Sequence, residues 1–219
     1  MKLVWSPEMA CNAYIDTVKT CKDLQESDQA EMISAMAGGW NPRFIVEAWS
    51  SGIEITTSIA LSIAARHIGA RYVCTVQNER SRSEYTNAFK DHDHDIQVPE
   101  LVVGEAKEVM KRFKGVEFMV VDGRRKDLYE MFGAAKYSVR GAVLMCKNGM
   151  QRYMDGFRWE LAVSEKEHVV RSVIIPVGQG LNIAYVKERR ESEKALVKDH
   201  SRWITRIDKK TGEEHVFRG

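Results

Sequence analysis

The sequence has few cysteines and no long apolar run. Its four cysteines, Cys11, Cys21, Cys74 and Cys146, lack Cys-x-x-Cys spacing, and a chain of 219 residues does not need disulfide bonds to hold a core. No apolar stretch approaches the length that crosses a membrane. The first residues also lack the apolar core and cleavage site of a secretory signal. These absences favour a protein of the reducing cytoplasm, with the nucleus as the alternative.

Neither sign of charge dominates the sequence. It has 33 basic and 31 acidic residues, for a formal net charge of +2. Such a chain has little long-range field with which to hold a polyanion, so nucleic acid is not an expected partner. Hydrophobic residues make up 44% and charged residues 29% of the chain, which is typical of a globular protein. We expect one domain followed by a tail.

Short apolar runs alternate with segments of helical periodicity over most of the chain. The runs predict strands near 43–49, 72–76, 100–103, 118–121 and 142–146, and the periodic segments predict helices near 55–67, from 81, at 106–113 and at 128–135. This alternation predicts an α/β fold of the Rossmann-like type with a mostly parallel sheet. Strands at 169–176 and 181–186, separated by one short turn, predict an antiparallel hairpin that closes the sheet.

The rest of the chain divides into two flanking parts. Residues 1–40 predict two helices packed on the core, one beginning at Ser6-Pro7-Glu8 and one beginning near Ser27 and stopping at Gly38-Gly39. Residues 41–186 form the predicted α/β domain. Residues 187–219 form a charged extension with a small hairpin at 203–207 and 214–217.

In a doubly wound sheet, ligands bind at the carboxyl ends of the strands, so residues directly after each apolar run are the candidates for a site. The first such group precedes a helix whose N-terminal amides can face a ligand. It consists of Glu47, Ala48, Trp49, Ser50, Ser51 and Gly52. This group is interpreted either as a glycine-poor ligand loop or as a turn that needs its glycine for backbone reasons alone.

The next two strand ends carry polar groups suited to a nucleoside. Gln77, Asn78 and Glu79 follow the second strand of the α/β domain, where such folds hold ribose hydroxyls; equally, they are residues that cap the following helix. Gly104, Glu105 and Ala106 follow the third, where the acid is able to accept from the exocyclic amine of an adenine. The alternative for this triplet is a helix start with an acidic first turn.

Asp122 is the strongest single candidate for catalysis or binding. It ends the fourth strand beside Arg124, Arg125 and Lys126, and the alternative is an aspartate that pairs with Arg124 or Arg125 to hold a loop. Lys147 follows the next strand between Cys146 and Asn148. A thiolate nucleophile there needs a base, which the sequence does not identify.

A metal site is not expected. Asp91-His92-Asp93-His94-Asp95 carries side chains that are able to bind a metal, but adjacent ligands rarely converge on one ion. A solvated loop is the favoured interpretation of this segment.

Several segments resemble the caffeoyl-CoA-type O-methyltransferases. They are MISAMAGGWNPRFIVEAWSSG at 32–52, the Gly104-Glu105-Ala106 turn, the aspartate at 122 and IPVGQGL at 175–181. Over nearly its whole length the chain is similar to a plant family of uncharacterised, methyltransferase-like proteins, which have a domain of unknown function. That similarity lies in WSPE at 5–8, RSRSEY at 80–85, DGRRKD at 122–127 and SRWI at 201–204.

The resemblance implies a seven-stranded class I methyltransferase fold that binds S-adenosylmethionine, with S-adenosylhomocysteine as the product. It places the methionine part of the cofactor near Glu47 and Gly52, the ribose near Gln77 to Glu79, and the adenine near Glu105. Asp122 and Lys147 are then the residues expected to aid deprotonation or orientation of a small nucleophile.

The sequence departs from this family at two places. Ala48 to Ser51 replace a more glycine-rich loop, so that Trp49 either obstructs the pocket or forms its wall. The catechol-type members bind a divalent cation through an acid pair after the fourth strand and an Asp-Asn pair after the fifth. Here Arg124 stands in place of the second acid, and Cys146-Lys147-Asn148 supplies at most an asparagine. A hard cation needs several oxygen ligands, so we predict no metal and no magnesium-dependent catechol chemistry.

Three hypotheses about function follow. The first is a methyltransferase-like enzyme, independent of metal, that acts on a small-molecule nucleophile. The second is a protein of the same fold that binds the cofactor or a protein partner without turnover. The third is a protein that binds another nucleotide or an acyl-CoA, with the phosphates of that ligand held by Arg124, Arg125 and Lys126. A small-molecule ligand is the expected partner in the first and third, no membrane is expected in any, and a homodimer is compatible with all three.

Overall fold

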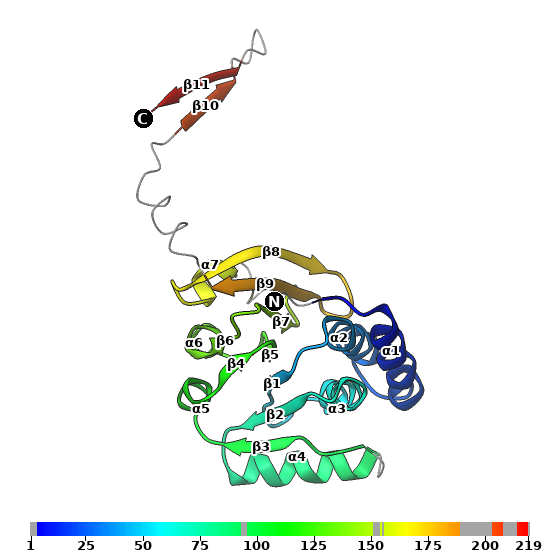
Figure 1. Cartoon of the computed structure of the whole chain (residues 1–219). Helices are drawn as coiled ribbons and strands as arrows, with labels where there is room; N and C mark the ends of the chain where they lie inside the picture. Colours follow the sequence, from blue (N-terminus) through cyan, green and yellow to red (C-terminus); the bar gives the residue numbers. More distant parts are fainter. Residues whose placement is uncertain are drawn as a thin grey trace. The chain divides into compact units, whose positions relative to one another are not determined.

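A seven-stranded sheet with the strand order β3-β2-β1-β5-β7-β9-β8 forms the centre of the protein (Figure 1). Its strands are β1 (Phe44–Ala48), β2 (Arg71–Val76), β3 (Glu100–Val103), β5 (Phe118–Asp122), β7 (Ala142–Lys147), β8 (Glu167–Ile175) and β9 (Leu181–Glu188). The first five strands in this order pair in parallel, and β9 pairs antiparallel with both β7 and β8. The α/β fold with a mostly parallel sheet and a closing hairpin, predicted from the sequence, is therefore confirmed.

The computed structural model describes residues 4–92, 96–150, 154, 156–188, 203–207 and 214–218. The chain divides into one unit at Met1–Glu188 and a second at Arg189–Gly219. In the second unit, β10 (Trp203–Ile207) pairs antiparallel with β11 (Glu214–Arg218). Residues 189–202 of the predicted charged extension, and residues 93–95 of the acidic and histidine-rich segment, lie outside the described residues.

Helices cover both faces of the sheet. They are α1 (Pro7–Cys21), α2 (Ser27–Trp40), α3 (Thr56–Ile68), α4 (Glu79–His92), α5 (Ala106–Arg112), α6 (Leu128–Ala134) and α7 (Trp159–Ala162). Figure 1 shows α1, α2 and α3 on one face and α5 and α6 on the other. The short strands β4 (Lys114–Val116) and β6 (Lys136–Tyr137) pair in a small separate sheet, and neither they nor α7 are predicted from the sequence.

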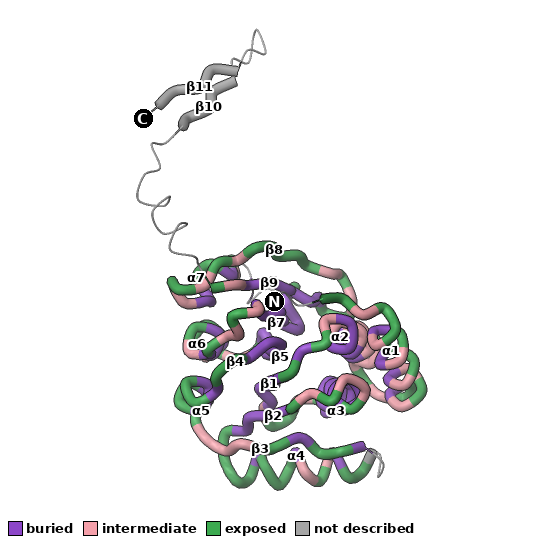
Figure 2. The backbone as a smooth tube through the Cα atoms, in the orientation of Figure 1, coloured by how far each residue is buried: buried purple, intermediate pink, exposed green. Residues whose placement is uncertain are grey.

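The central strands are apolar on both faces because both faces are covered. Ile45 and Phe118 pack with α1, α2 and α3, whereas Val46 and Met119 pack with α5 and α6. Figure 2 shows this burial concentrated in β1, β5 and β7. Strands buried on both sides read as continuous apolar runs, which is why they are visible in the sequence.

The N-terminal helices begin as the sequence indicates, but the predicted stop of the second helix is wrong. Ser6 caps α1, with its hydroxyl accepting from the Met9 amide at 3.4 Å. In contrast, α2 continues through Gly38 and Gly39 to Trp40. A Cβ on Gly38 would lie 2.5 Å from the backbone oxygen of Met9. These glycines therefore allow close packing against the N-terminal segment and do not end the helix.

The parallel strands bring their polar ends to one edge of the sheet. β1, β2, β3, β5 and β7 all point the same way, so the segments after them meet there. No helix in the described part of the chain is long and apolar enough to span a membrane.

Replacing Gly38 by alanine is expected to destabilise the protein. Alanine gains about 1 kcal/mol over glycine in a free helix. Here the added methyl group would overlap the backbone of α1, and overpacking of this kind costs about 1–3 kcal/mol. Urea unfolding of the full chain measures the change. Gly39→Ala is the matched control, because its methyl group meets only the outer edge of the half-exposed Trp5 ring, which is able to move. A Gly38→Ala protein that is more stable than wild type would contradict the packing explanation.

Candidate functional site

A small cavity of about 60 Å³ lies at the carboxyl ends of β1, β2 and β3, and we call it the crevice. Its lining consists of Trp49, Thr75, Val76, Gln77, Gly104, Glu105, Ala106, Arg125 and Asp127. Five candidates from three separate segments of the sequence therefore meet at one place: Trp49, Gln77, Gly104, Glu105 and Ala106. Arg125 and Asp127 complete the lining from the loop after β5, and no local pattern marks them as neighbours of the β1 loop.

Glu47 lies in the interior of the protein and does not line the crevice. It is 4% exposed, and its carboxyl group accepts hydrogen bonds from the hydroxyls of Tyr72 and Ser58, the second at 2.7 Å. Burial raises the pKa of Glu47, in opposition to these hydrogen bonds and to the nearby Lys147. Its position in β1 turns the side chain toward α3, so the structure separates it from the residues that follow it. Ala48, the last residue of β1, faces the opposite side and is buried in the core.

The loop after β1 is tied to α4. The Trp49 indole is buried against the Tyr85 ring at 5.3 Å and donates to the carbonyl of Ile53 at 3.1 Å. Ser51 and Gly52 bond to residues of α4, the Gly52 amide donating to Glu84 at 3.0 Å. Of the two sequence alternatives for Trp49, the structure shows a wall. The Gly52 amide is thus engaged by Glu84 at the surface.

The segment after β2 divides its three candidates between two roles. Gln77 is exposed and lines the crevice. Asn78 instead caps α4, where its side-chain oxygen accepts from the Ser81 amide at 2.9 Å. Glu79 begins α4 and pairs with Arg82 at 3.5 Å on the surface. The capping alternative therefore holds for Asn78.

The segment after β3 contributes all of its candidates to the crevice. Gly104 has a φ of 151°, and its amide donates to the Val76 carbonyl at 3.0 Å, which extends the pairing of β2 with β3 by one residue. Glu105 stands at the N-terminus of α5, and no hydrogen bond joins its side chain to the first turn of that helix. The carboxylate of Glu105 is therefore available at the crevice. Ala106, the first residue of α5, lines the crevice beside it.

Asp122 ends β5 in a nearly closed set of polar contacts. Its carboxylate accepts from the Arg124 guanidinium at 2.9 and 2.7 Å, from the Arg124 amide at 2.9 Å and from the Asn148 amide group at 2.9 Å. Burial alone would raise the pKa of Asp122, but Arg124 and Lys147 outweigh it and hold the pKa below its ordinary value. The group is therefore an ionised acceptor whose lone pairs are engaged. The pairing with Arg124 is the loop-holding alternative considered for this residue.

Lys147 extends the same network to the N-terminal helices. Its ammonium group lies 3.7 Å from Asp122 and donates to Glu26 at 2.8 Å and to Thr57 at 3.2 Å. Glu26 also lies 3.6 Å from Arg124. Glu26 precedes α2 in a left-handed conformation with φ of 58°, and nothing in its local sequence marks it as part of the site.

Arg125 closes the crevice from the side of β5. Its guanidinium donates to Asp127 at 2.9 and 2.7 Å, to the Ser50 hydroxyl, and more weakly to the carbonyl of Trp49 at 3.5 Å. The side chain is 14% exposed. It therefore links the loop after β5 to the loop after β1 across the space that both strands leave open.

A larger pocket of about 510 Å³ adjoins the crevice, and we call it the basic pocket. Its lining consists of Gly123, Arg124, Arg125, Lys126, Leu128, Tyr129, Met154, Gly156 and Phe157. Tyr129 and Phe157 form an aromatic pair at 5.4 Å. Arg124 and Arg125 are engaged with acids, whereas Lys126 is exposed on the surface of the loop.

The Cys146 thiol and the metal-binding side chains remain to be placed. Cys146 is fully buried, and burial together with Asp122 raises the pKa of its thiol well above the ordinary value, so it is not a thiolate at neutral pH. Within the described residues, no group of three or more His, Cys, Asp or Glu side chains is arranged to hold a metal ion.

Solved structures bound to S-adenosylmethionine or its product share this fold. The SAH-bound methyltransferase PaMTH1 of Podospora anserina superimposes with a TM-score of 0.56 at 15% identity, over 82% of this chain and 88% of that one. A methyltransferase of Geobacter sulfurreducens gives 0.53 at 18% identity, over 80% and 88%. A point mutant of MtNAS in complex with S-adenosylmethionine gives 0.56 at 11%, over 84% and 73%. The fold is therefore the Rossmann-like methyltransferase fold.

The family of the chain is also defined. The model of the family described as "Protein of unknown function (DUF1442)" matches residues 1–219, and the chain belongs to that family. Among curated proteins there is no sequence match.

Replacing Glu47 by glutamine is expected to remove a pH dependence of stability. Because the folded-state pKa of Glu47 lies above its ordinary value of 4.5, the folded state keeps a proton that the unfolded chain releases. The wild-type free energy of unfolding should fall as the pH rises from about 4.5 through the folded-state pKa, by up to about 1.4 kcal/mol per pH unit from this group. Glutamine mimics the protonated acid and should abolish that contribution.

Urea unfolding of both proteins across this pH range measures the difference. Glu117→Gln is the control, because Glu117 is equally buried but pairs with Arg140 at 3.2 Å, so its loss should destabilise the protein at neutral pH. An identical pH dependence in wild type and Glu47→Gln would show that the carboxyl group is not protonated in the folded state.

Proposed function

We propose that this protein binds S-adenosylmethionine, or its product S-adenosylhomocysteine, in the crevice and a second small molecule in the basic pocket. The observation that carries the proposal is that one side chain, Arg125, lines both spaces. Ligands on the two sides of Arg125 would be neighbours, as the reactants of a group transfer must be. The fold shared with an SAH-bound methyltransferase and with the S-adenosylmethionine complex of MtNAS supports the same assignment.

The polar groups of the crevice suit the proposed cofactor. The Gln77 amide is able to donate to and accept from ribose hydroxyls, and the Glu105 carboxylate is able to accept from an exocyclic amine. The volume is the constraint, because about 60 Å³ is far below the roughly 300–1,000 Å³ of small-molecule pockets. Binding therefore requires that Arg125 leave Ser50, and the basic pocket beside it offers room for the displaced side chain.

The contacts of Asp122 and Lys147 favour positioning over proton removal. When bound, S-adenosylmethionine supplies an electrophilic methyl group on a positively charged sulfur. Asp122 is an engaged, ionised acceptor and Lys147 is paired with Glu26, so both hold the end of the sheet in place. We propose a nucleophile that needs no deprotonation, such as a carboxylate, drawn to the basic pocket by Lys126. No metal takes part in this proposal, because Arg124 and Asn148 occupy the lone pairs that a cation would need.

A second candidate function is binding without turnover. Asp122, Glu26, Arg124 and Lys147 neutralise one another, which is what a structural ion network requires. Such a protein would keep affinity for the cofactor or its product and transfer no methyl group. Counting methyl groups transferred from labelled S-adenosylmethionine to a panel of small carboxylic acids separates the two candidates.

The state of the cysteines bears on the cellular location. All four cysteines are free and three of them are buried, which suits the reducing cytoplasm that we propose as the location. A homodimer, a plant origin and a relationship to the caffeoyl-CoA-type O-methyltransferases stay predictions from the sequence.

Isothermal titration of the full chain with S-adenosylmethionine and with S-adenosylhomocysteine is the direct test. We expect saturable binding of at least one of them. Undetectable binding of both at about 1 mM, equivalent to a binding free energy weaker than about −4 kcal/mol, would overturn the proposed function.

Replacing Arg125 by alanine is expected to tighten binding of S-adenosylhomocysteine by about tenfold. The wild type must break the charged hydrogen bond to Ser50 before the crevice opens, and such a bond is worth about 1.5–3 kcal/mol. Ser50→Ala removes the same bond while keeping the guanidinium, so it should shift the affinity in the same direction. Arg158→Ala, at an exposed arginine with one long ion pair, is the control. Weaker binding in both crevice variants would show that Arg125 and Ser50 hold the ligand and do not exclude it.

A further inference from the structure

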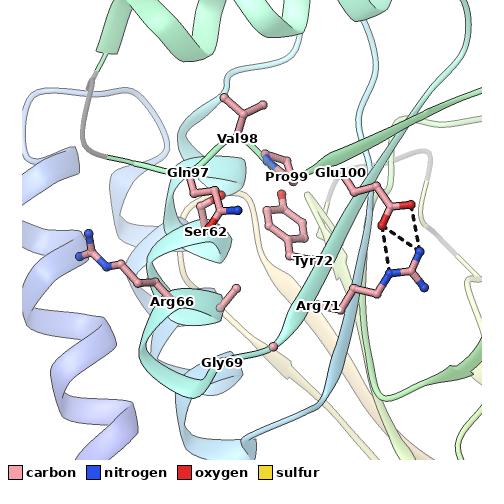
Figure 3. A pocket seen from close by; sticks show the side chains of 11 residues that line it. Ser62, Arg66, Gly69, Arg71, Tyr72, Gln97, Val98, Pro99 and Glu100 are labelled. Carbon is pink, nitrogen blue, oxygen red and sulfur yellow. Dashed lines mark hydrogen bonds and ion pairs between the residues drawn. The ribbon is translucent and has the colours of Figure 1, made fainter.

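A third pocket, distinct from the crevice and the basic pocket, lies at the opposite end of the sheet from the crevice. It has a volume of about 480 Å³ and is formed by the last turns of α3, the start of β2 and the segment before β3 (Figure 3). We call it the amino-end pocket, because it lies where β2 and β3 begin. Its size falls within the range of small-molecule sites, whereas the crevice is far smaller.

One buried polar group in this pocket has no partner. Ser62 is 6% exposed, and its hydroxyl makes no hydrogen bond within the described part of the chain. Buried hydroxyls are nearly always satisfied, so an unpaired one in a residue of the pocket lining is a group to which a bound molecule would supply the missing partner. The Ser62 oxygen is covered in this structure, so that contact requires a small shift of the pocket wall. Gln97, which also lines the pocket and is exposed, offers both a donor and an acceptor (Figure 3).

The remaining wall is largely apolar. Ala65 and Ala70 come from α3 and the turn after it, and Val98 and Pro99 come from the segment before β3. The Tyr72 ring lines the pocket while its hydroxyl points away to bond with Glu47 inside the protein. Val98 is 37% exposed, so apolar surface here is accessible to solvent. A flat apolar body would bury this surface and gain hydrophobic free energy.

The charges at the edge of the pocket favour an anion. Arg71 is neutralised by Glu100, with three contacts of 2.8 to 3.0 Å, and its guanidinium lies over the Phe44 ring. Arg66 is in a different situation. Its partner Asp16, at 3.8 Å, is shared with His67 at 2.9 Å and with Lys19 at 3.7 Å.

Sharing one carboxylate among these neighbours leaves the Arg66 guanidinium with unused donors. The side chain of Arg66 is 52% exposed and belongs to the pocket lining. Figure 3 shows its guanidinium directed away from Tyr72 and Gln97, so a ligand carboxylate would bind it after this exposed side chain turns back over the pocket. A planar guanidinium of this kind matches a carboxylate, which it is able to hold by two parallel hydrogen bonds.

We propose that the amino-end pocket binds a small aromatic carboxylate. The carboxylate would pair with Arg66, the ring would lie on the apolar wall, and a polar ring substituent would bond to the Ser62 hydroxyl, with Gln97 beside it. The site is separate from the crevice and from the basic pocket, so the proposal does not depend on the proposed function.

Titration of the full chain with 4-hydroxybenzoate, benzoate and benzamide tests this site. We expect 4-hydroxybenzoate to bind most tightly, because it has both the carboxylate and a hydroxyl, and benzamide to bind least tightly. Arg66→Ala and Ser62→Ala should each weaken 4-hydroxybenzoate binding by about fivefold or more, equivalent to the loss of one hydrogen bond. Both variants should fold, since Arg66 is half exposed and the Ser62 hydroxyl has no partner to lose.

Lys126→Ala is the matched control, because it removes a cation from the basic pocket, the other place where a small anion is expected. Binding that survives Lys126→Ala but weakens in both amino-end variants supports the proposal. Binding lost in Lys126→Ala alone, or no saturable binding at about 10 mM, overturns it. Saturating S-adenosylhomocysteine should leave the affinity unchanged, and a failure of that cofactor to bind does not affect this outcome.

Discussion

The ion pairs of the Asp122 carboxylate are the interactions on which the arrangement at the carboxyl end of the sheet depends. This carboxylate lies 1% exposed at the end of β5 and holds Arg124 of its own loop and Asn148 of the segment after β7. Through Lys147 and Glu26 the same network reaches the segment that precedes α2. A buried charge without partners would be costly, so these three segments are fixed relative to one another by the need to keep it paired.

This constraint explains why the site is shaped as it is. The acids and cations that the chain gathers at the strand ends mostly satisfy each other. Gln77, Glu105 and Lys126 are exposed polar groups in the lining of the crevice and the basic pocket. Arg125, the residue after Arg124, is likewise paired within the protein, because its guanidinium donates to both Asp127 and Ser50 across the crevice. If the crevice binds the proposed cofactor, its specificity would depend on side chains such as Arg125 that exchange partners, and less on preformed empty space.

The fold is largely predictable from the sequence because local patterns encode it. Buried strands such as β1 and β5 are continuous apolar runs, and each helix between them has its own periodicity. The candidate site is only partly predictable. Strand ends identified Gln77, Glu105 and Asp122, but Glu26 and Arg125 act through contacts 121 and 75 residues away, which no local pattern records. Gly38 and Gly39 misled for the same reason, because their packing partners lie in another segment.

The pairing of Glu26 with Lys147 also has a consequence for folding of the protein during translation. The first two helices are made early, but the cation that holds Glu26 is 121 residues further along the chain. At translation rates of roughly 5–20 residues per second, that cation follows on the order of ten seconds later. Arg124, the second cation near Glu26 at 3.6 Å, is also made after these helices, so the ion network around Glu26 is complete only after β7 has emerged.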